Sequence, residues 1–110
     1  MKFKHGTRRL ATGGDKVVGF VHLSTNEDGT KEFEAIYTDP ATFGTGLGAM
    51  LMEQAMEWVG PADTMLTVAS YNERAISFYQ KNGFEIIAGS EHLYVDTMPA
   101  VRMIRKGEQQ

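Results

Sequence analysis

The sequence predicts an α/β domain built on a mixed sheet, and three observations carry this prediction. Three strand-like segments separated by short polar turns come first, then two helix-like segments with a buried strand between them, then two or three short strands. Short turns favour antiparallel neighbours, whereas a strand reached through a helix pairs in parallel. We therefore expect a single domain over residues 1–110, with an antiparallel N-terminal meander, a central parallel pair and two helices.

The meander is expected to use strands over residues 7–12, 16–24 and 31–38. Gly13-Gly14-Asp15 is a strong hairpin signal, and Asn26-Glu27-Asp28-Gly29 predicts the second turn. Asp39-Pro40 then ends the third strand.

A helix is expected over residues 47–59. Glu53 and Glu57 lie four residues apart and predict one polar stripe, and Gly60-Pro61 predicts the end of the helix. The residues of its buried face recur at helical spacing: Leu47, Met50, Leu51, Ala55 and Trp58.

The second half of the chain predicts a buried strand over residues 65–69 and a second helix. Asn72 can cap this helix through its side-chain oxygen, and Asn82-Gly83 is a C-terminal signal. The last strands are expected over residues 84–88, 92–96 and 101–105.

Composition excludes several classes of protein. The net charge is −3, whereas a nucleic-acid-binding protein normally shows a basic face. There is no cysteine and no apolar segment approaching 18 residues, so we expect no disulfide, no membrane partner and a cytoplasmic location. His5, His22 and His92 are far apart and show no ligand spacing, so no metal site is expected.

The segment Phe43-Gly44-Thr45-Gly46-Leu47-Gly48 is the most informative feature of the chain. It follows a predicted strand and opens a predicted helix. The first N–H groups of a helix have no partner within it, and the helix dipole adds positive charge there. In an acidic chain, these backbone amides are the expected ligands for a phosphate group.

Glycine-rich turns of this kind also occur in two nucleotide-binding folds. Gly44-x-Gly46-x-x-Ala49 matches the dinucleotide-binding pattern, but that fold needs an acidic residue closing the next strand. Here Asp63 precedes that strand, which ends in Ala69-Ser70. A P-loop is also excluded, because no Lys-Ser or Lys-Thr follows the glycines. A purely structural loop remains the alternative.

A second group of residues narrows the interpretation of the turn. It comprises Leu66-x-Val68 and Asn72-x-x-Ala75-x-x-Phe78-Tyr79-x-x-x-Gly83-Phe84. Together with Tyr37-x-Asp39-Pro40 and the glycine turn, it resembles the GNAT superfamily of acyl-CoA-dependent N-acyltransferases over residues 17–105. The family's phosphate-binding signature falls on Phe43, Gly46 and Gly48, with Phe43 standing where the family carries Arg or Gln.

The resemblance implies a GNAT-like fold and an acetyl-CoA cosubstrate. The pyrophosphate would lie on the amides of the turn, and the pantetheine would pair with the end of the third strand as an added strand. The residues that would contact the coenzyme are Ile36, Tyr37, Thr38, Phe43, Gly44, Thr45, Gly46, Leu47, Gly48, Ala49, Asn72 and Tyr79. For Asn72 the alternative is a plain helix cap.

Catalytic roles also follow from the resemblance. Tyr79 matches the tyrosine that protonates the leaving thiolate, and its alternative is an aromatic residue that packs on the sheet. Glu32 lies where many members carry a glutamate that assists removal of the amine proton, and Glu34 is two residues further on the same strand. The alternative for both glutamates is two solvated charges.

Function is therefore expected to be acetyl transfer from acetyl-CoA to an amine of unknown identity by direct attack. Family members usually begin with a strand and two helices that wall the acceptor site, and only about fifteen residues precede the second strand here. Part of that wall is therefore expected to be missing, which favours a homodimer. The alternatives are a non-catalytic CoA-binding or protein-interaction module and a structural partner of another GNAT chain.

Overall fold

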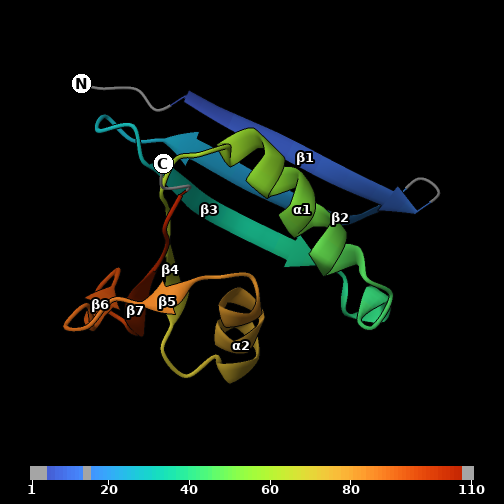
Figure 1. Cartoon of the computed structure of the whole chain (residues 1–110). Helices are drawn as coiled ribbons and strands as arrows, with labels where there is room; N and C mark the ends of the chain where they lie inside the picture. The colour runs from blue at the N-terminus through green and yellow to red at the C-terminus, as the bar shows by residue number, and fades with distance from the viewer. Residues whose placement is uncertain (1–4, 14–15, 108–110) are drawn as a thin grey trace.

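The computed structural model describes residues 5–13 and 16–107, which form one seven-stranded mixed sheet with two α-helices (Figure 1). The strand order is β1-β2-β3-β4-β7-β5, and β6 pairs with β7. The elements in chain order are β1 (His5–Gly13), β2 (Lys16–Thr25), β3 (Lys31–Thr38), the 3₁₀ helix η1 (Pro40–Thr42), α1 (Leu47–Val59), β4 (Thr64–Ala69), α2 (Glu73–Lys81), β5 (Glu85–Ile86), β6 (His92–Tyr94) and β7 (Met98–Arg105).

The predicted topology is confirmed. β1, β2 and β3 form an antiparallel meander, β3 and β4 are parallel, and β7 returns antiparallel to β4. Residues 14 and 15 of the predicted first turn lie outside the described residues.

The parallel pairing of β3 with β4 is short. It covers Lys31–Thr64, Glu32–Met65 and Phe33–Leu66, although both strands continue beyond this point. On the other edge of β3 the register with β2 shifts at Glu34, as in a β-bulge. The sheet therefore opens between the distal ends of β3 and β4.

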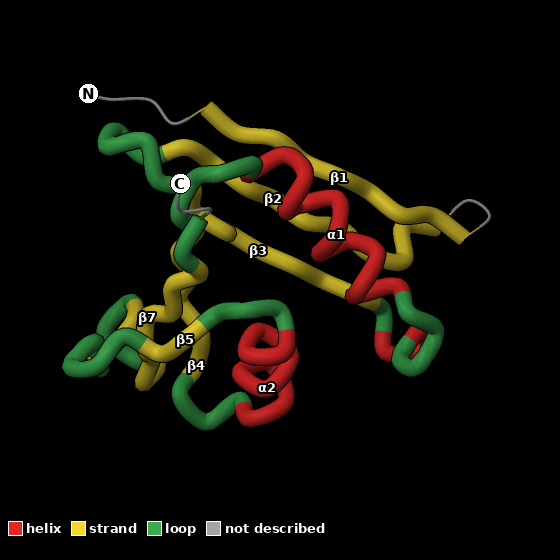
Figure 2. The backbone as a smooth tube through the Cα atoms, viewed as in Figure 1, coloured by secondary structure: helices red, strands yellow, loops and turns green. Residues whose placement is uncertain are grey.

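Both helices cover the same face of the sheet, and Figure 2 shows α1 lying along the first three strands. Phe33 packs edge-to-face against Tyr79 of α2 and against Phe84, which joins the two halves of the core. The remaining buried residues of this core are Val21, Leu23, Leu51, Met52, Ala55, Val59, Leu66, Val68, Val101 and Met103.

The buried face of α1 and the bounds of two strands differ from the expectation. Met50, expected on the buried face of α1, is 47% exposed, whereas Met52 and Val59 are buried. The strand expected over residues 92–96 ends at Tyr94, because Val95 and Asp96 adopt positive φ in a tight turn. β7 begins at Met98, earlier than expected, since β4, β5 and β6 all pair with it.

Neither helix in the described ranges is long and apolar enough to cross a membrane.

Gly19 of β2 marks a close approach between the sheet and α1. A Cβ atom there would lie 2.9 Å from the Tyr37 carbonyl oxygen and 3.1 Å from Leu51 Cδ1. We expect Gly19→Ala to lower the free energy of unfolding by about 1–3 kcal/mol, because the backbone oxygen cannot move away cheaply. Urea denaturation measures this change. Val17→Ala, on an exposed position of the same strand, is the control and should change stability by less than about 0.5 kcal/mol.

Candidate functional site

Local hydrogen bonds hold the segment that leads through the glycine turn into α1. Asp39 accepts a hydrogen bond from the Ala41 amide (2.9 Å), and the Thr42 hydroxyl donates to the Asp39 carbonyl (2.6 Å). Gly46 then takes the left-handed conformation at the N-cap of α1, with φ 88°. Among the described residues no side chain caps this helix, so its first N–H groups are available to a ligand.

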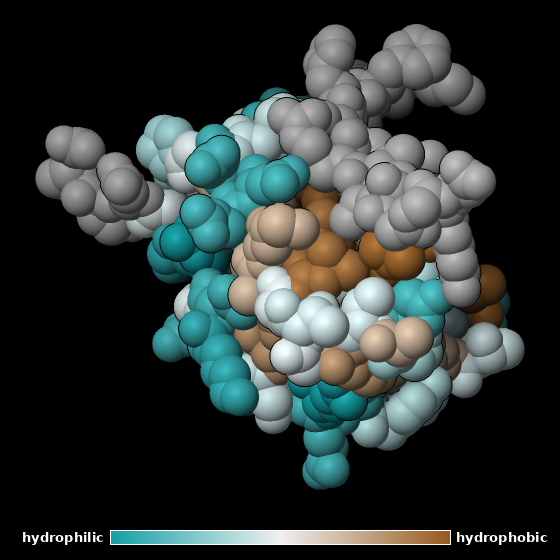
Figure 3. All heavy atoms as spheres, turned by 90° about the vertical axis from the view of Figure 1, so that its right-hand side faces the viewer, coloured by the Kyte–Doolittle hydropathy of each residue, from teal (hydrophilic) through white to brown (hydrophobic). Residues whose placement is uncertain are grey.

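A cavity of about 400 Å³ lies between this turn, the end of β3 and the start of α2. On the side of the molecule where the turn lies, hydrophobic surface gathers between hydrophilic side chains (Figure 3). The residues that line the cavity are Ile36, Thr38, Thr42, Phe43, Gly44, Gly46, Leu47, Gly48, Ala49, Asn72, Arg74, Ala75, Phe78 and Tyr79.

All of the predicted coenzyme contacts except Tyr37 and Thr45 line this cavity. Tyr37 alternates with Ile36 and Thr38 along β3, and its ring stacks on Phe20 at 5.8 Å between centroids. The Thr45 hydroxyl instead donates to the Thr42 carbonyl (2.5 Å).

Asn72 caps α2, because its side-chain oxygen accepts a hydrogen bond from the Ala75 amide (3.1 Å). Asn72 also lines the cavity, and the cap bond does not use its side-chain N–H₂ group. One side chain can therefore cap the helix and donate to a ligand.

Tyr79 combines packing with a place in the cavity wall. It is only 9% exposed, and its ring contacts Phe33, Phe78 and Phe84 edge-to-face. Burial raises the pKa of Tyr79 to about 12, because the phenolate would lose its hydration. The hydroxyl therefore stays protonated at neutral pH and can act as a hydrogen-bond donor.

Glu32 and Glu34 line a second cavity of about 310 Å³, together with Phe33, Thr67, Tyr94 and Arg102. Glu32 and Phe33 are neighbours along β3, so their side chains lie on opposite faces of the sheet. Phe33 faces the helices, and this cavity therefore lies on the face that the helices leave open. The structure thus brings the two glutamates together but places them in a different cavity from Tyr79.

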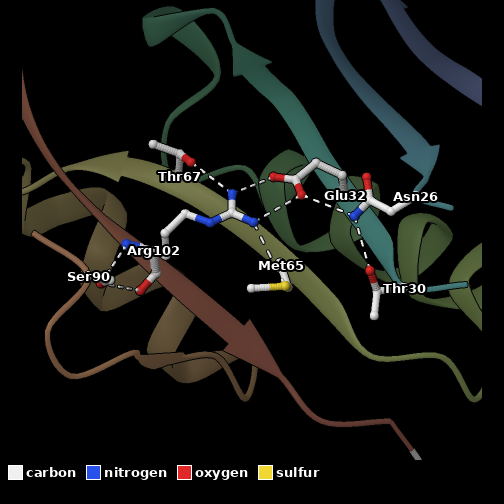
Figure 4. A network of polar contacts seen from close by, with 7 residues as sticks. All are labelled: Asn26, Thr30, Glu32, Met65, Thr67, Ser90 and Arg102. Carbon is white, nitrogen blue, oxygen red and sulfur yellow. Dashed lines mark hydrogen bonds and ion pairs between the residues drawn. The ribbon is translucent and has the colours of Figure 1, made fainter. Parts of the chain in front are cut away.

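A polar network centred on Arg102 holds Glu32 (Figure 4). Arg102 donates from Nη1 to Glu32 Oε2 (2.7 Å) and from Nη2 to Glu32 Oε1 (3.1 Å). Nη1 also donates to the Thr67 hydroxyl of β4 (2.9 Å). The hydrogen bond to Glu32 raises the pKa of Arg102, and the charges of Glu32 and Glu34 add to this effect.

The two cavities border the same opening in the sheet. Ile36 and Tyr79 line the cavity on the helix face, whereas Glu34 and Thr67 line the cavity on the open face. Residues 34–38 of β3 and the end of β4 are not paired with each other there. The two sets of side chains therefore lie on opposite faces of the sheet beside the same unpaired segment.

Sequence reasoning missed two arginines of the site. Arg102 alternates along β7 with the buried Val101 and Met103, a pattern that places it on the face opposite the core. Arg74 follows the capping Asn72 within the first turn of α2, and its guanidinium lies over the Phe43 ring. The sequence does not show that Arg102 pairs with Glu32 or that Arg74 contacts Phe43.

These features define the protein as an α/β protein with a candidate anion-binding site. Its mixed sheet splits at a parallel strand pair, and the N-terminus of α1 lies beside the split without a side-chain cap from the described residues. The chain belongs to the GNAT acetyltransferase family, whose domain model matches residues 7–86.

Characterised and solved relatives agree with this assignment. The chain is 35% identical over 77 residues to the peptidyl-lysine N-acetyltransferase YjaB of Escherichia coli, covering 70% of this chain and 48% of that protein. YjaB of Salmonella typhimurium is 38% identical over 80 residues, covering 73% of this chain and 50% of that protein. The chain therefore spans about half the length of the curated relatives it matches.

Solved structures share the fold. Nourseothricin acetyltransferase superposes with a TM-score of 0.79 at 27% identity, covering 94% of this chain and 66% of that chain. A Bacillus anthracis protein described as a streptothricin acetyltransferase, solved with acetyl coenzyme A, gives a TM-score of 0.81 at 24% identity, covering 94% and 64%.

Gly46 and Gly48 of the turn differ in how well their positions would accept a larger residue. A Cβ at Gly46 meets nothing within 4 Å, but its φ of +88° is costly for an L-residue. A Cβ at Gly48 would lie 3.5 Å from the Phe78 ring, an ordinary contact. We expect Gly46→Ala to lower the free energy of unfolding by about 1–2 kcal/mol and Gly48→Ala to leave it unchanged or raise it. Chemical denaturation of both variants tests this, and equal effects would contradict it.

The Arg102–Glu32 ion pair is partly buried, with side-chain exposures of 28% and 12%. Arg102→Gln leaves the Glu32 carboxylate without its charged partner, and we expect a loss of about 2–4 kcal/mol in the free energy of unfolding. The double variant Glu32→Gln/Arg102→Gln should lose less, since no unpaired charge remains. A double-mutant cycle in urea measures the difference, and additive losses would show that the pair contributes nothing.

Proposed function

We propose that this chain binds acetyl-CoA and transfers the acetyl group to an amine. The observation that carries the proposal is the cavity at the split of the sheet, where an uncapped helix N-terminus, the free edge of β3 and Tyr79 meet. The match to the GNAT family supports the same activity.

Each part of the coenzyme has a suitable surface. The pyrophosphate fits the amides at the start of α1, where the helix dipole favours an anion. The pantetheine carries amide groups that can pair with residues 34–38 of β3, whose edge toward β4 is not paired with that strand. The acetyl thioester then reaches the split between the strands, beside Tyr79.

The chemical step is direct acyl transfer. The amine nitrogen attacks the thioester carbonyl carbon, a C–N bond forms, and the C–S bond breaks. The nitrogen loses a proton and the departing sulfur gains one, giving an N-acetyl amine and the free thiol of coenzyme A. Tyr79, whose buried hydroxyl is protonated at neutral pH, donates its hydrogen to the departing sulfur and regains a proton from water as coenzyme A leaves.

A glutamate of the open face accepts the amine proton. Arg102 already occupies both carboxylate oxygens of Glu32, which leaves this group poorly placed to act as a base. Glu34 lies at the register shift of β3 and lines the same cavity. We therefore assign the base to Glu34 and a positioning role to Glu32.

The acceptor is a lysine side chain of a protein. The two YjaB relatives are peptidyl-lysine N-acetyltransferases. The cavity of the open face presents two carboxylates against one guanidinium, a balance that suits an entering ammonium group.

Calorimetric titration with acetyl-CoA, followed by a thiol-release assay with lysine-containing peptides, tests this function. We expect stoichiometric binding and peptide-dependent release of thiol. Tyr79→Phe should bind acetyl-CoA like the wild type and release thiol at least tenfold more slowly. Binding without release would instead identify a non-catalytic coenzyme-binding module, and no binding would reject the proposal.

The same thiol-release assay distinguishes the roles of Glu32 and Glu34. Glu34→Gln should slow thiol release most at neutral pH, where the amine must still lose its proton, and should leave coenzyme binding intact. Glu32→Gln should act mainly through stability. A larger rate loss in Glu32→Gln than in Glu34→Gln, at equal folded fractions, would reverse the assignment.

A further inference from the structure

Arg74 lines the helix-face cavity, where it contacts the first residue of the glycine turn. Its guanidinium carbon lies 3.8 Å from the centre of the Phe43 ring, close enough for a cation–π contact. Phe43 comes from the turn before α1 and Arg74 from the first turn of α2, and both line the cavity. The contact therefore joins the two helix N-termini across the site.

The charge of this cavity comes from one side chain. Among the described residues that line it, Arg74 is the only one charged at neutral pH, and no carboxylate is present. The chain as a whole carries a net charge of −3, so this positive site stands out against an acidic background. Such a cavity favours an anionic ligand beside the N-terminus of α1.

The guanidinium keeps its hydrogen-bond donors. Within the described parts of the chain, Arg74 makes no ion pair or hydrogen bond, and its guanidinium contacts the Phe43 ring. A guanidinium held against an aromatic ring retains N–H donors that can bind a phosphate bidentately. The ring also limits the conformations of a long side chain, which lowers the entropy lost on binding.

We propose that Arg74, held by Phe43, binds a phosphate group of the coenzyme. This inference rests on the proposed acetyl-CoA site and names the residue that supplies its cationic side-chain contact. Position 43 carries an apolar ring where the family signature has a polar side chain. The ring positions a cation from α2 instead, so Phe43 is a positioning residue and Arg74 contacts the ligand.

Two phosphate groups of the coenzyme could be the partner: the pyrophosphate and the 3′-phosphate of the ribose. Titration with coenzyme A and with dephospho-coenzyme A, which lacks the 3′-phosphate, separates them. We expect Arg74→Gln to weaken coenzyme A binding at least tenfold. An equal loss with dephospho-coenzyme A assigns Arg74 to the pyrophosphate, and a loss confined to coenzyme A assigns it to the 3′-phosphate.

Lys81→Gln is the matched control, because it removes one positive charge from the other end of the same helix. It should change the affinity for coenzyme A less than twofold. The dependence of affinity on salt concentration should fall in Arg74→Gln and stay unchanged in Lys81→Gln.

Phe43→Leu tests the role of the ring. It should weaken binding about threefold, and adding it to Arg74→Gln should cause no further loss, because the ring acts through the guanidinium. Additive losses would overturn the role of Phe43. Wild-type binding with an unchanged Arg74→Gln affinity would overturn the inference alone, whereas absence of coenzyme binding to the wild type would overturn the proposed function as well.

Discussion

The separation of β3 from β4 after the Phe33–Leu66 pair is the constraint on which the rest of the site depends. Different interactions support the sheet on its two faces beside this point. On the helix face, Phe33 packs against Tyr79 and Phe84. On the open face, Arg102 ties Glu32 of β3 to Thr67 of β4. The strands remain paired up to the opening, and beyond it their facing edges are not paired with each other.

This arrangement assigns different tasks to the two faces of one sheet. The helix face provides helix N-termini, apolar walls and a protonated phenol, which suit a phosphate-bearing thioester. The open face provides carboxylates, which suit an incoming amine. The proposed acyl transfer would join these two faces, because residues of the same short segment of β3 line both cavities.

Much of the site was predictable because its signals are local. The turn from Phe43 to Gly48 and the cap at Asn72 are read from neighbouring residues, and both lie where the sequence places them. The surroundings of Tyr79 were harder to predict. Its ring is part of the core and of the cavity wall at once, so the packing and catalytic interpretations of this residue are not exclusive.

By itself, the sequence determined the order of the elements, the antiparallel start, the parallel crossover and the glycine turn before α1. Caps, glycine conformations and hydrophobic periodicity act over a few residues and can be read in one dimension. Only the tertiary structure decided that Glu32 is paired with Arg102, 70 residues away, and that Arg74 lies on Phe43. These contacts depend on the strand order and on where β3 shifts register, which no local pattern specifies.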